Sequence, residues 1–214
     1  GIPKIYQYPL FQKNKQHIID TPKNFFKKEL NLDVNEDSQI KVNNTLVSQS
    51  IKDFKIDFSK TNILLGIGGS GPTKRIPAKT FLSIIERLIE IKECRFFLAT
   101  GKDIGEQKIL NEILNSKFKN SLTRLDDLSI KDTLPIIKNC NLSICNDSSF
   151  SHLSAALGIK TITLMADTPI IYGNYNSKMF PIIPDGEETV SHNTLGKEKI
   201  NPQSIFKKII EILN

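Results

Sequence analysis

The sequence predicts an α/β fold built around a doubly wound parallel sheet. From residue 62 onward, short apolar runs of strand length alternate with amphipathic segments of helix length. The clearest unit lies at residues 140–165, where an apolar run, four residues of helix-capping type, a Ser- and Ala-rich helix and a second apolar run follow one another. Gly158 stands where that helix is expected to end. Alternation of this kind gives parallel strands joined by crossover helices.

The same patterns locate the other elements of this region. Strands are expected at 63–65, 95–99, 142–145 and 162–164, with shorter ones near residues 122 and 182. Helices are expected to begin at Pro77, Asp103, Ser129 and Asn201-Pro202. The helix that Pro77 opens has an apolar stripe made of Phe81, Leu82, Ile85, Leu88 and Ile89.

The first 60 residues differ from the rest of the chain. A helix is expected from Thr21-Pro22 through Leu30, a polar linker at 31–44 and a weaker helix at 45–53. This region has little apolar periodicity of its own, so we expect it to pack on another part of the protein. We therefore divide the chain at residues 1–60 and 61–214.

The composition indicates a globular protein with a mildly basic surface. The 214 residues carry a net charge of +6, and the Lys and Arg residues are spread along the chain. No apolar run approaches the roughly 20 residues of a membrane span, and no basic module with interleaved aromatic residues is visible. We therefore expect no nucleic-acid partner, and a surface suited to anionic substrates or acidic lipid.

The cysteines indicate a reducing compartment. Cys94, Cys140 and Cys145 show no CxxC spacing, and three cysteines cannot all pair. Cys94 and Cys145 lie in apolar, strand-like runs. We therefore expect buried free thiols, as in a cytoplasmic protein.

The start of the helix in the 140–165 unit has the chemistry to hold an anion. Its first backbone N–H groups are unpaired, and the helix dipole is positive there. Ser148 and Ser149 add hydroxyl donors, and His152 lies one helical turn after Ser148 on the same side. Asp147 could cap the helix or accept hydrogen bonds from sugar hydroxyls beside a phosphate. The competing interpretation is that these residues only cap the helix and pack it on the sheet.

A glycine-rich loop precedes the helix that starts at Pro77. Residues 66–71 match G-x-G-x-x-G after a strand, but two prolines delay the helix that a dinucleotide site requires. Ala99-Thr100 also stand where such a site needs an acid, so a dehydrogenase is disfavoured. A phosphate-binding loop fits better, with backbone amides, the Ser70 hydroxyl and Lys74 as a point charge. The alternative is a solvated loop with an ordinary surface lysine.

The remaining polar residues give weaker signals. Glu106 follows a strand end and could bind ribose hydroxyls, or it could be a first-turn acid favoured by the helix dipole. Asp126-Asp127 does not form a DxD motif and is expected in a solvated turn. His17 and His192 lack partners at metal-ligand spacing. We therefore expect no metal site.

Two segments of the sequence are similar to motifs of one known family. N-D-S-S-F-S-H-L-S-A-A-L-G, followed by an apolar strand and A-D-T-P, resembles a D-[TS]-G-x-x-H-[LI]-x-A-A-L segment. G-G-S-G-P-T-K-R-I-P resembles a loop that carries a lysine just before a Trp-Pro helix start. In this order and spacing the motifs are typical of glycosyltransferase family 9, the bacterial lipopolysaccharide heptosyltransferases, and the resemblance covers about residues 60–214. Ser149 stands where the family has glycine, and Ile76 where it has tryptophan.

The resemblance implies a GT-B glycosyltransferase, in which two Rossmann-like domains hold the substrates between them. Residues 61–214 would be the C-terminal, donor-binding domain, and residues 1–60 the tail of the N-terminal domain plus the interdomain linker. The donor would be a nucleotide-diphospho-sugar, typically ADP-heptose, bound without a metal or other cofactor. Lys74, Asp147 and His152 are the catalytic candidates that the resemblance implies. The donor-binding residues that it implies are Gly69, Ser70, Lys74, Glu106, Asp147, Ser148, Ser149 and His152.

Two hypotheses about function follow. The first is an inverting sugar transferase of lipopolysaccharide synthesis, at the inner face of the inner membrane, with a glycolipid or saccharide acceptor. Nothing in residues 1–60 resembles the acceptor domain and its catalytic base, so this chain would be the donor half. The second is a non-catalytic nucleotide-binding module, either a degenerate relative or a partner of a separate acceptor chain.

Overall fold

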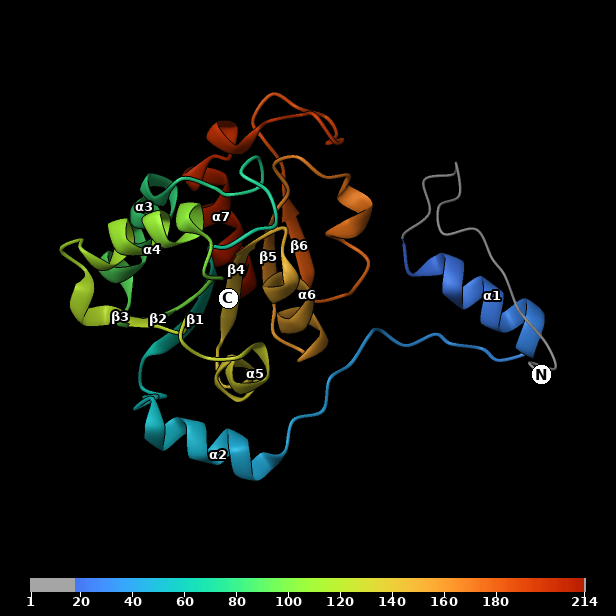
Figure 1. Cartoon of the computed structure of the whole chain (residues 1–214), viewed down its shortest axis with the longest axis horizontal. Helices are drawn as coiled ribbons and strands as arrows, with labels where there is room; N and C mark the ends of the chain where they lie inside the picture. The colour runs from blue at the N-terminus through green and yellow to red at the C-terminus, as the bar shows by residue number, and fades with distance from the viewer. Residues whose placement is uncertain (1–17, 214) are drawn as a thin grey trace.

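A computed structural model describes residues 18–213, and its centre is a parallel sheet of six strands. The strand order is β3-β2-β1-β4-β5-β6, and every neighbouring pair is parallel. The predicted doubly wound α/β fold is therefore confirmed (Figure 1). The strands are β1 (Thr61–Gly66), β2 (Cys94–Ala99), β3 (Leu122–Arg124), β4 (Leu142–Asn146), β5 (Thr161–Leu164) and β6 (Met179–Ile182).

Helices cover both faces of the sheet because successive strand residues point to opposite faces. Ile63 and Leu65 of β1 pack in one core with α3, α4 and α7, whereas Leu64 packs in a second core with α5. All three side chains are fully buried, as expected for strands covered on both faces. The helices are α3 (Ala78–Ile91), α4 (Ile104–Leu114), α5 (Ile130–Lys138), α6 (Ser149–Ala156) and α7 (Pro202–Leu213).

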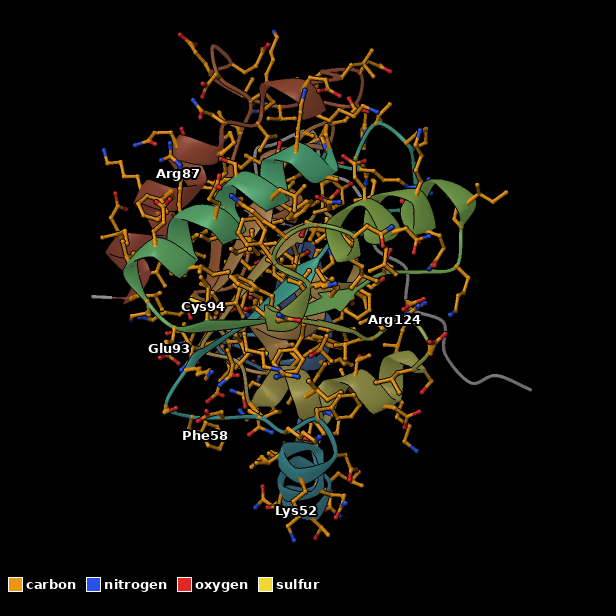
Figure 2. The ribbon with its side chains drawn as sticks, turned by 90° about the vertical axis from the view of Figure 1, so that its left-hand side faces the viewer. Lys52, Phe58, Arg87, Glu93, Cys94 and Arg124 are labelled. Carbon is orange, nitrogen blue, oxygen red and sulfur yellow. The ribbon has the colours of Figure 1, made fainter. Side chains whose placement is uncertain are left out.

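Part of the N-terminal region belongs to this packing. Helix α2 (Asn44–Asp53) lies on α5 and forms the outermost layer on that side, with Lys52 at its outer surface (Figure 2). Asn139, the C-cap of α5, joins the two helices by donating to Val47 O at 3.1 Å and to Ser50 Oγ at 3.0 Å. Helix α1 (Asp20–Leu30) lies apart from the sheet at the end of an extended segment (Figure 1).

The expected elements are present, with small shifts in the faces that they bury. In α3, Ile84 is fully buried, whereas Ile89 is 36% exposed, so its place in the predicted stripe is wrong. At about 100° per residue, Ile84, Ile85 and Leu88 lie within about 60° of Phe81 around the helix, whereas Ile89 lies about 80° away, at the edge of this face. Helix α6 ends before Gly158, which has the expected left-handed φ of 83°.

The three cysteines are buried and unpaired, as predicted. Burial raises the pKa of Cys94 to about 11 and that of Cys145 to about 12, so both are neutral thiols near pH 7. Within residues 18–213, none of the helices has the length and apolar character needed to cross a membrane. His17, one of the residues considered for metal binding, lies outside the described residues.

The sheet has a topological switch point between β1 and β4. The chain continues from β1 to β2 on one side and from β4 to β5 on the other, so the loops that follow β1 and β4 diverge at the carboxyl edge. The two strands approach closely here. A Cβ atom added at Gly66 would lie only 2.6 Å from Cys145 Sγ, so the approach requires a residue without a side chain. A crevice at this edge is the expected ligand position in an open α/β sheet.

We predict that α2 contributes to the stability of the domain through Asn139. Replacing Asn139 by Ala removes its bonds to Val47 O, Ser50 Oγ and Pro135 O. We expect the free energy of unfolding, measured by urea denaturation, to fall by about 1–3 kcal/mol. The exposed Asn120→Ala change is the control, and equal stabilities of the two variants would contradict the role given to Asn139.

Candidate functional site

A pocket of about 660 Å³ lies at the carboxyl edge of the sheet, at the switch point. It brings together residues from the loops after β1, β2 and β4. Every residue that the sequence indicated for donor binding lines it: Gly69, Ser70, Lys74, Glu106, Asp147, Ser148, Ser149 and His152.

An ion pair in the pocket joins two of these loops. Lys74 Nζ, from the glycine-rich loop, lies 2.7 Å from Asp147 Oδ2 at the end of β4. His152 Nε2 lies 3.9 Å from Asp147 Oδ1. Asp147 is 6% exposed, so its charge is nearly removed from water and needs this compensation.

Asp147 does not cap α6, so that alternative is wrong. The N-cap is Ser148, in an extended conformation with no hydrogen bond from its side chain to the helix. Its hydroxyl is buried and bonds to no atom of the described chain. The carboxylate of Asp147 is turned to Lys74 instead, because the buried negative charge gains more from an ammonium group than from a backbone N–H. The first N–H groups of α6 and the Ser148 hydroxyl are thus left for a ligand.

Glu106 fixes the start of the glycine-rich loop. Gly69 N donates to Glu106 Oε1 at 2.6 Å, and a Cβ atom on Gly68 would lie 2.9 Å from the same oxygen. Arg75 fixes the other side of the loop by donating from Nε to Gly69 O at 2.9 Å. Glu106 is 7% exposed. Its carboxylate both holds the glycine-rich loop through Gly69 N and lines the pocket.

The turn expected at Asp126-Asp127 is present and Asp127 is exposed, but the side chain of Asp126 is buried, contrary to the expectation. Its carboxylate receives two bonds of 2.7 Å from the Arg124 guanidinium and one of 3.1 Å from Lys102 Nζ. The Arg124 bonds, together with those from Lys102 and Gln107, hold the pKa of Asp126 well below its usual range, although burial opposes this. Asp126 is 4% exposed and lines the pocket near the end of β3.

Burial lowers the pKa of His152, and the nearby positive charge of Lys74 adds to this effect. The carboxylate of Asp147 opposes the shift but does not reverse it. His152 is therefore neutral near pH 7. Below about pH 6.5, His152 therefore binds fewer protons in the folded protein than in the unfolded chain. For this reason His152 makes the free energy of unfolding increase as the pH rises toward 6.5.

Several residues that line the pocket were not indicated as site residues by the sequence. Tyr172 and His192 come from the long loops on either side of β6, which show no periodic pattern, and their rings meet edge to face at 6.4 Å. Leu128, Ile130 and Phe150 add apolar surface to the pocket. A lysine and a helix N-terminus with apolar surface beside them suit a phosphorylated ligand that also carries a flat ring.

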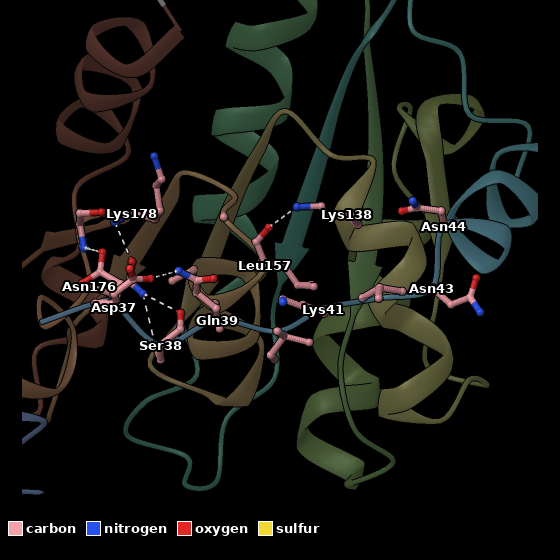
Figure 3. Close-up of a pocket in the computed structure, with 17 residues that line it drawn as sticks. Asp37, Ser38, Gln39, Lys41, Asn43, Asn44, Lys138, Leu157, Asn176 and Lys178 are labelled. Atoms are coloured by element: carbon pink, nitrogen blue, oxygen red, sulfur yellow. Dashed lines mark hydrogen bonds between the residues drawn. The ribbon is translucent and has the colours of Figure 1, made fainter. Parts of the chain in front are cut away.

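A larger hollow, of about 1070 Å³, lies at the opposite end of α6 (Figure 3). The segment 36–44 crosses it, and none of the predicted site residues lines it. Ile40 N donates to Ala156 O at 2.8 Å there, and Lys138 Nζ to Leu157 O at 2.7 Å. The last carbonyls of α6 are thus satisfied by protein groups. The N-terminus of α2 also lies at this hollow, where the side chain of its N-cap, Asn43, already accepts from Thr45 N at 2.8 Å.

Comparison with known proteins agrees with this geometry. The family model described as "Glycosyltransferase family 9 (heptosyltransferase)" matches residues 6–210. The chain belongs to glycosyltransferase family 9. The resemblance carried by the two sequence motifs is therefore confirmed, and the sheet is of the GT-B class.

Individual members of family 9 cover most of this chain. Lipopolysaccharide heptosyltransferase 1 of Campylobacter coli is 28% identical over an alignment of 163 residues, and the match covers 72% of this chain and 47% of that protein. The structure of E. coli ADP-heptose lps heptosyltransferase II has a TM-score of 0.68 and 22% identity, over 82% of this chain and 53% of the other. E. coli heptosyltransferase WaaC with ADP has a TM-score of 0.69 and 15% identity, over 93% and 57%. The chain thus spans about half the length of these family 9 relatives.

We predict that Asp147 tunes the titration of His152. In the free protein, ¹H–¹⁵N NMR should give His152 a titration midpoint below the ordinary value of about 6.5. Asp147→Asn removes the negative charge that favours the imidazolium, so the midpoint should fall further.

Asp53→Asn, on the exposed surface of α2, is the matched control and should leave the midpoint unchanged. A His152 midpoint at or above 6.5 in the native chain, or one that Asp147→Asn does not move, would show that burial and Asp147 do not govern this ring.

Proposed function

We propose that this chain is the donor-binding half of a heptosyltransferase that uses ADP-heptose or a closely related nucleotide-diphospho-sugar. The observation that carries the proposal is the Lys74–Asp147 pair beside the N-terminus of α6, in a pocket at the switch point of a family 9 sheet. The names of two matched relatives support this choice, because one contains ADP-heptose and the other describes an enzyme with ADP.

Each part of the pocket fits one part of such a donor. Lys74, the free Ser148 hydroxyl and the first N–H groups of α6 would bind the diphosphate. Asp147, accepting from Lys74 through one oxygen, has the other available for a sugar hydroxyl. Glu106 would lie near the ribose, as the resemblance implies, and the apolar surface at Leu128 would suit the base.

The role of Ser149 and Ser70 in this proposal is smaller. Both line the pocket and are exposed, so their hydroxyls can donate to phosphate oxygens. Gly69 contributes its backbone, which Glu106 and Arg75 hold in place. No metal or other cofactor enters the proposal.

The chemistry would be a displacement at the anomeric carbon. An acceptor hydroxyl oxygen forms the new bond to that carbon, the bond to the phosphate oxygen breaks, and the electron pair leaves with the nucleoside diphosphate. The hydroxyl proton passes to a base that we place in the acceptor-binding half, as the resemblance implies. Lys74, His152 and the α6 dipole stabilise the charge that develops on the leaving diphosphate.

The acceptor, the association with a membrane surface and the cytoplasmic location remain predictions from the resemblance. So does the boundary between residues 1–60 and 61–214. A non-catalytic nucleotide-binding module remains the alternative, and the transfer experiment below separates it from an enzyme half.

We predict that Lys74→Ala weakens ADP binding by about 1.5–3 kcal/mol, the range for a hydrogen bond to a charged group. Adenosine lacks the phosphates, so its binding should change much less. Calorimetry with both ligands tests this, and retained adenosine binding shows that the variant is folded.

Lys79→Ala is the charge-matched control, because Lys79 pairs with Glu198 outside the pocket and its side chain is 71% exposed. Equal losses for ADP and adenosine in the Lys74 variant would refute a phosphate role for Lys74.

We also predict that this chain by itself transfers no sugar, because the acceptor half and its base are supplied elsewhere. The assay combines the purified chain with nucleotide-sugars and lipopolysaccharide-core acceptors. Addition of the acceptor-binding half of a family 9 relative should restore transfer if the chain is an enzyme half. Turnover by the chain alone that disappears in Lys74→Ala would refute this donor-half proposal, and no turnover in any combination would favour the non-catalytic module.

A further inference from the structure

Tyr175 received no role from the sequence, yet it holds the ring of His152. Tyr175 Oη lies 2.8 Å from His152 Nδ1. The two rings also stack, with 5.6 Å between centroids and 18° between planes. Tyr175 lies in the loop between β5 and β6, whereas His152 is on α6. The imidazole is therefore fixed through one nitrogen and one face by a residue of another segment.

The direction of this hydrogen bond follows from the groups around the ring. Burial lowers the pKa of His152, so the ring is neutral near pH 7 and carries one proton. Burial also raises the pKa of Tyr175, with a smaller contribution from Asp147, so its hydroxyl keeps its proton. Nε2 faces the Asp147 carboxylate, and a lone pair there would be repelled by it. The favoured arrangement has the proton on Nε2, with the Tyr175 hydroxyl donating to Nδ1.

We propose that Tyr175 is a positioning residue that fixes His152 with its Nε2–H directed toward Asp147 and the pocket. The functional part of this inference rests on the proposed function, because Nε2–H would then donate to an oxygen of the diphosphate or of the sugar. Without the Tyr175 hydroxyl, the ring can rotate about its last bond or move its proton to Nδ1, and either change removes that donor.

The turn that presents Tyr175 is held from outside by the N-terminal segment. Asn176, 4% exposed, donates from Nδ2 to Ser38 O and Ser38 Oγ, both at 3.4 Å. Ser177 N donates to Asp37 Oδ2 at 3.0 Å, and Figure 3 shows Asp37, Ser38 and Asn176 together. The hydrogen bonds from Ser177 hold the pKa of Asp37 below its usual range. The two residues after Tyr175 are thus anchored, as a positioning residue requires.

A purely structural role makes a different prediction. If Tyr175 only fills space beside α6, its ring matters and its hydroxyl does not. Tyr175→Phe keeps the ring and removes the hydroxyl, so it separates the two roles without opening a cavity.

The experiment uses the whole chain with ¹⁵N-labelled histidine, in the absence of nucleotide and above pH 7. Long-range ¹H–¹⁵N spectra show which ring nitrogen carries the proton and whether the bare nitrogen accepts a hydrogen bond. In the native chain, His152 should carry the proton on Nε2 and accept at Nδ1. In Tyr175→Phe, the Nδ1 resonance should move toward that of an unbonded nitrogen, and ADP affinity should fall by about threefold to tenfold.

Ser59→Ala is the control for loss of a hydroxyl, since Ser59 is exposed at the amino end of β1, far from the pocket. A native His152 protonated on Nδ1 would overturn the proposal, and so would a Tyr175→Phe variant with an unchanged Nδ1 resonance or unchanged ADP affinity. If Tyr175→Phe does not fold, the tautomer of the native chain decides. If the native chain does not bind ADP, the proposed function fails, while the spectra without nucleotide still decide the role of Tyr175.

Discussion

Two carboxylates that the fold removes from water, Asp147 and Glu106, determine the course of the glycine-rich loop. Glu106 accepts from Gly69 N at the start of the loop, and Asp147 pairs with Lys74 at its end. A buried carboxylate without a partner costs several kcal/mol. The two carboxylates therefore hold the loop at both ends. In turn, the loop supplies the partners without which burying these carboxylates would be unfavourable. The same two contacts place the loop amides and the lysine beside α6.

This arrangement depends on close packing beneath the loop. Gly66 allows β1 and β4 to approach, and Asn146 donates from Nδ2 to Ile67 O at 2.8 Å and to Gly68 O at 3.2 Å. The hydrogen bonds of Asn146 thus join the loops after β1 and β4 where they leave the sheet, although about 80 residues separate the two loops in the sequence. A site assembled from two loops can be precise when both loops begin on such a rigid contact.

The sequence predicted the fold well because its signals are local. Apolar runs, capping residues such as Asp103 and Ser129, and Gly158 mark strands and helix ends within a few residues. That the site residues line one pocket could be predicted because the carboxyl ends of parallel strands meet at one edge of the sheet. Their roles in binding a donor stay predictions from the family resemblance.

The features that could not be predicted depend on contacts between distant segments. Asp126 is buried because a guanidinium two residues earlier folds back onto it and Lys102 approaches from the loop after β2. Tyr175 and His192 come from loops without periodicity, so no pattern indicates where their side chains lie. The pairing of Lys74 with Asp147 joins residues 73 positions apart and needs the strand order to be known.

The placement of Pro181 in the edge strand β6 has a consequence for the behaviour of this protein at high concentration. Thr161 N and Met165 N donate to the carbonyls of Lys178 and Ile182. The backbone N–H and C=O groups of the even-numbered residues of β6 therefore point toward β5, and those of the odd-numbered residues point outward. Pro181 therefore lacks its N–H on the free side, where a strand from another molecule would have to pair. At the opposite edge, β3 has only three residues. Both borders of the sheet are thus poor templates for strand addition, which protects a fully parallel sheet from edge-to-edge aggregation.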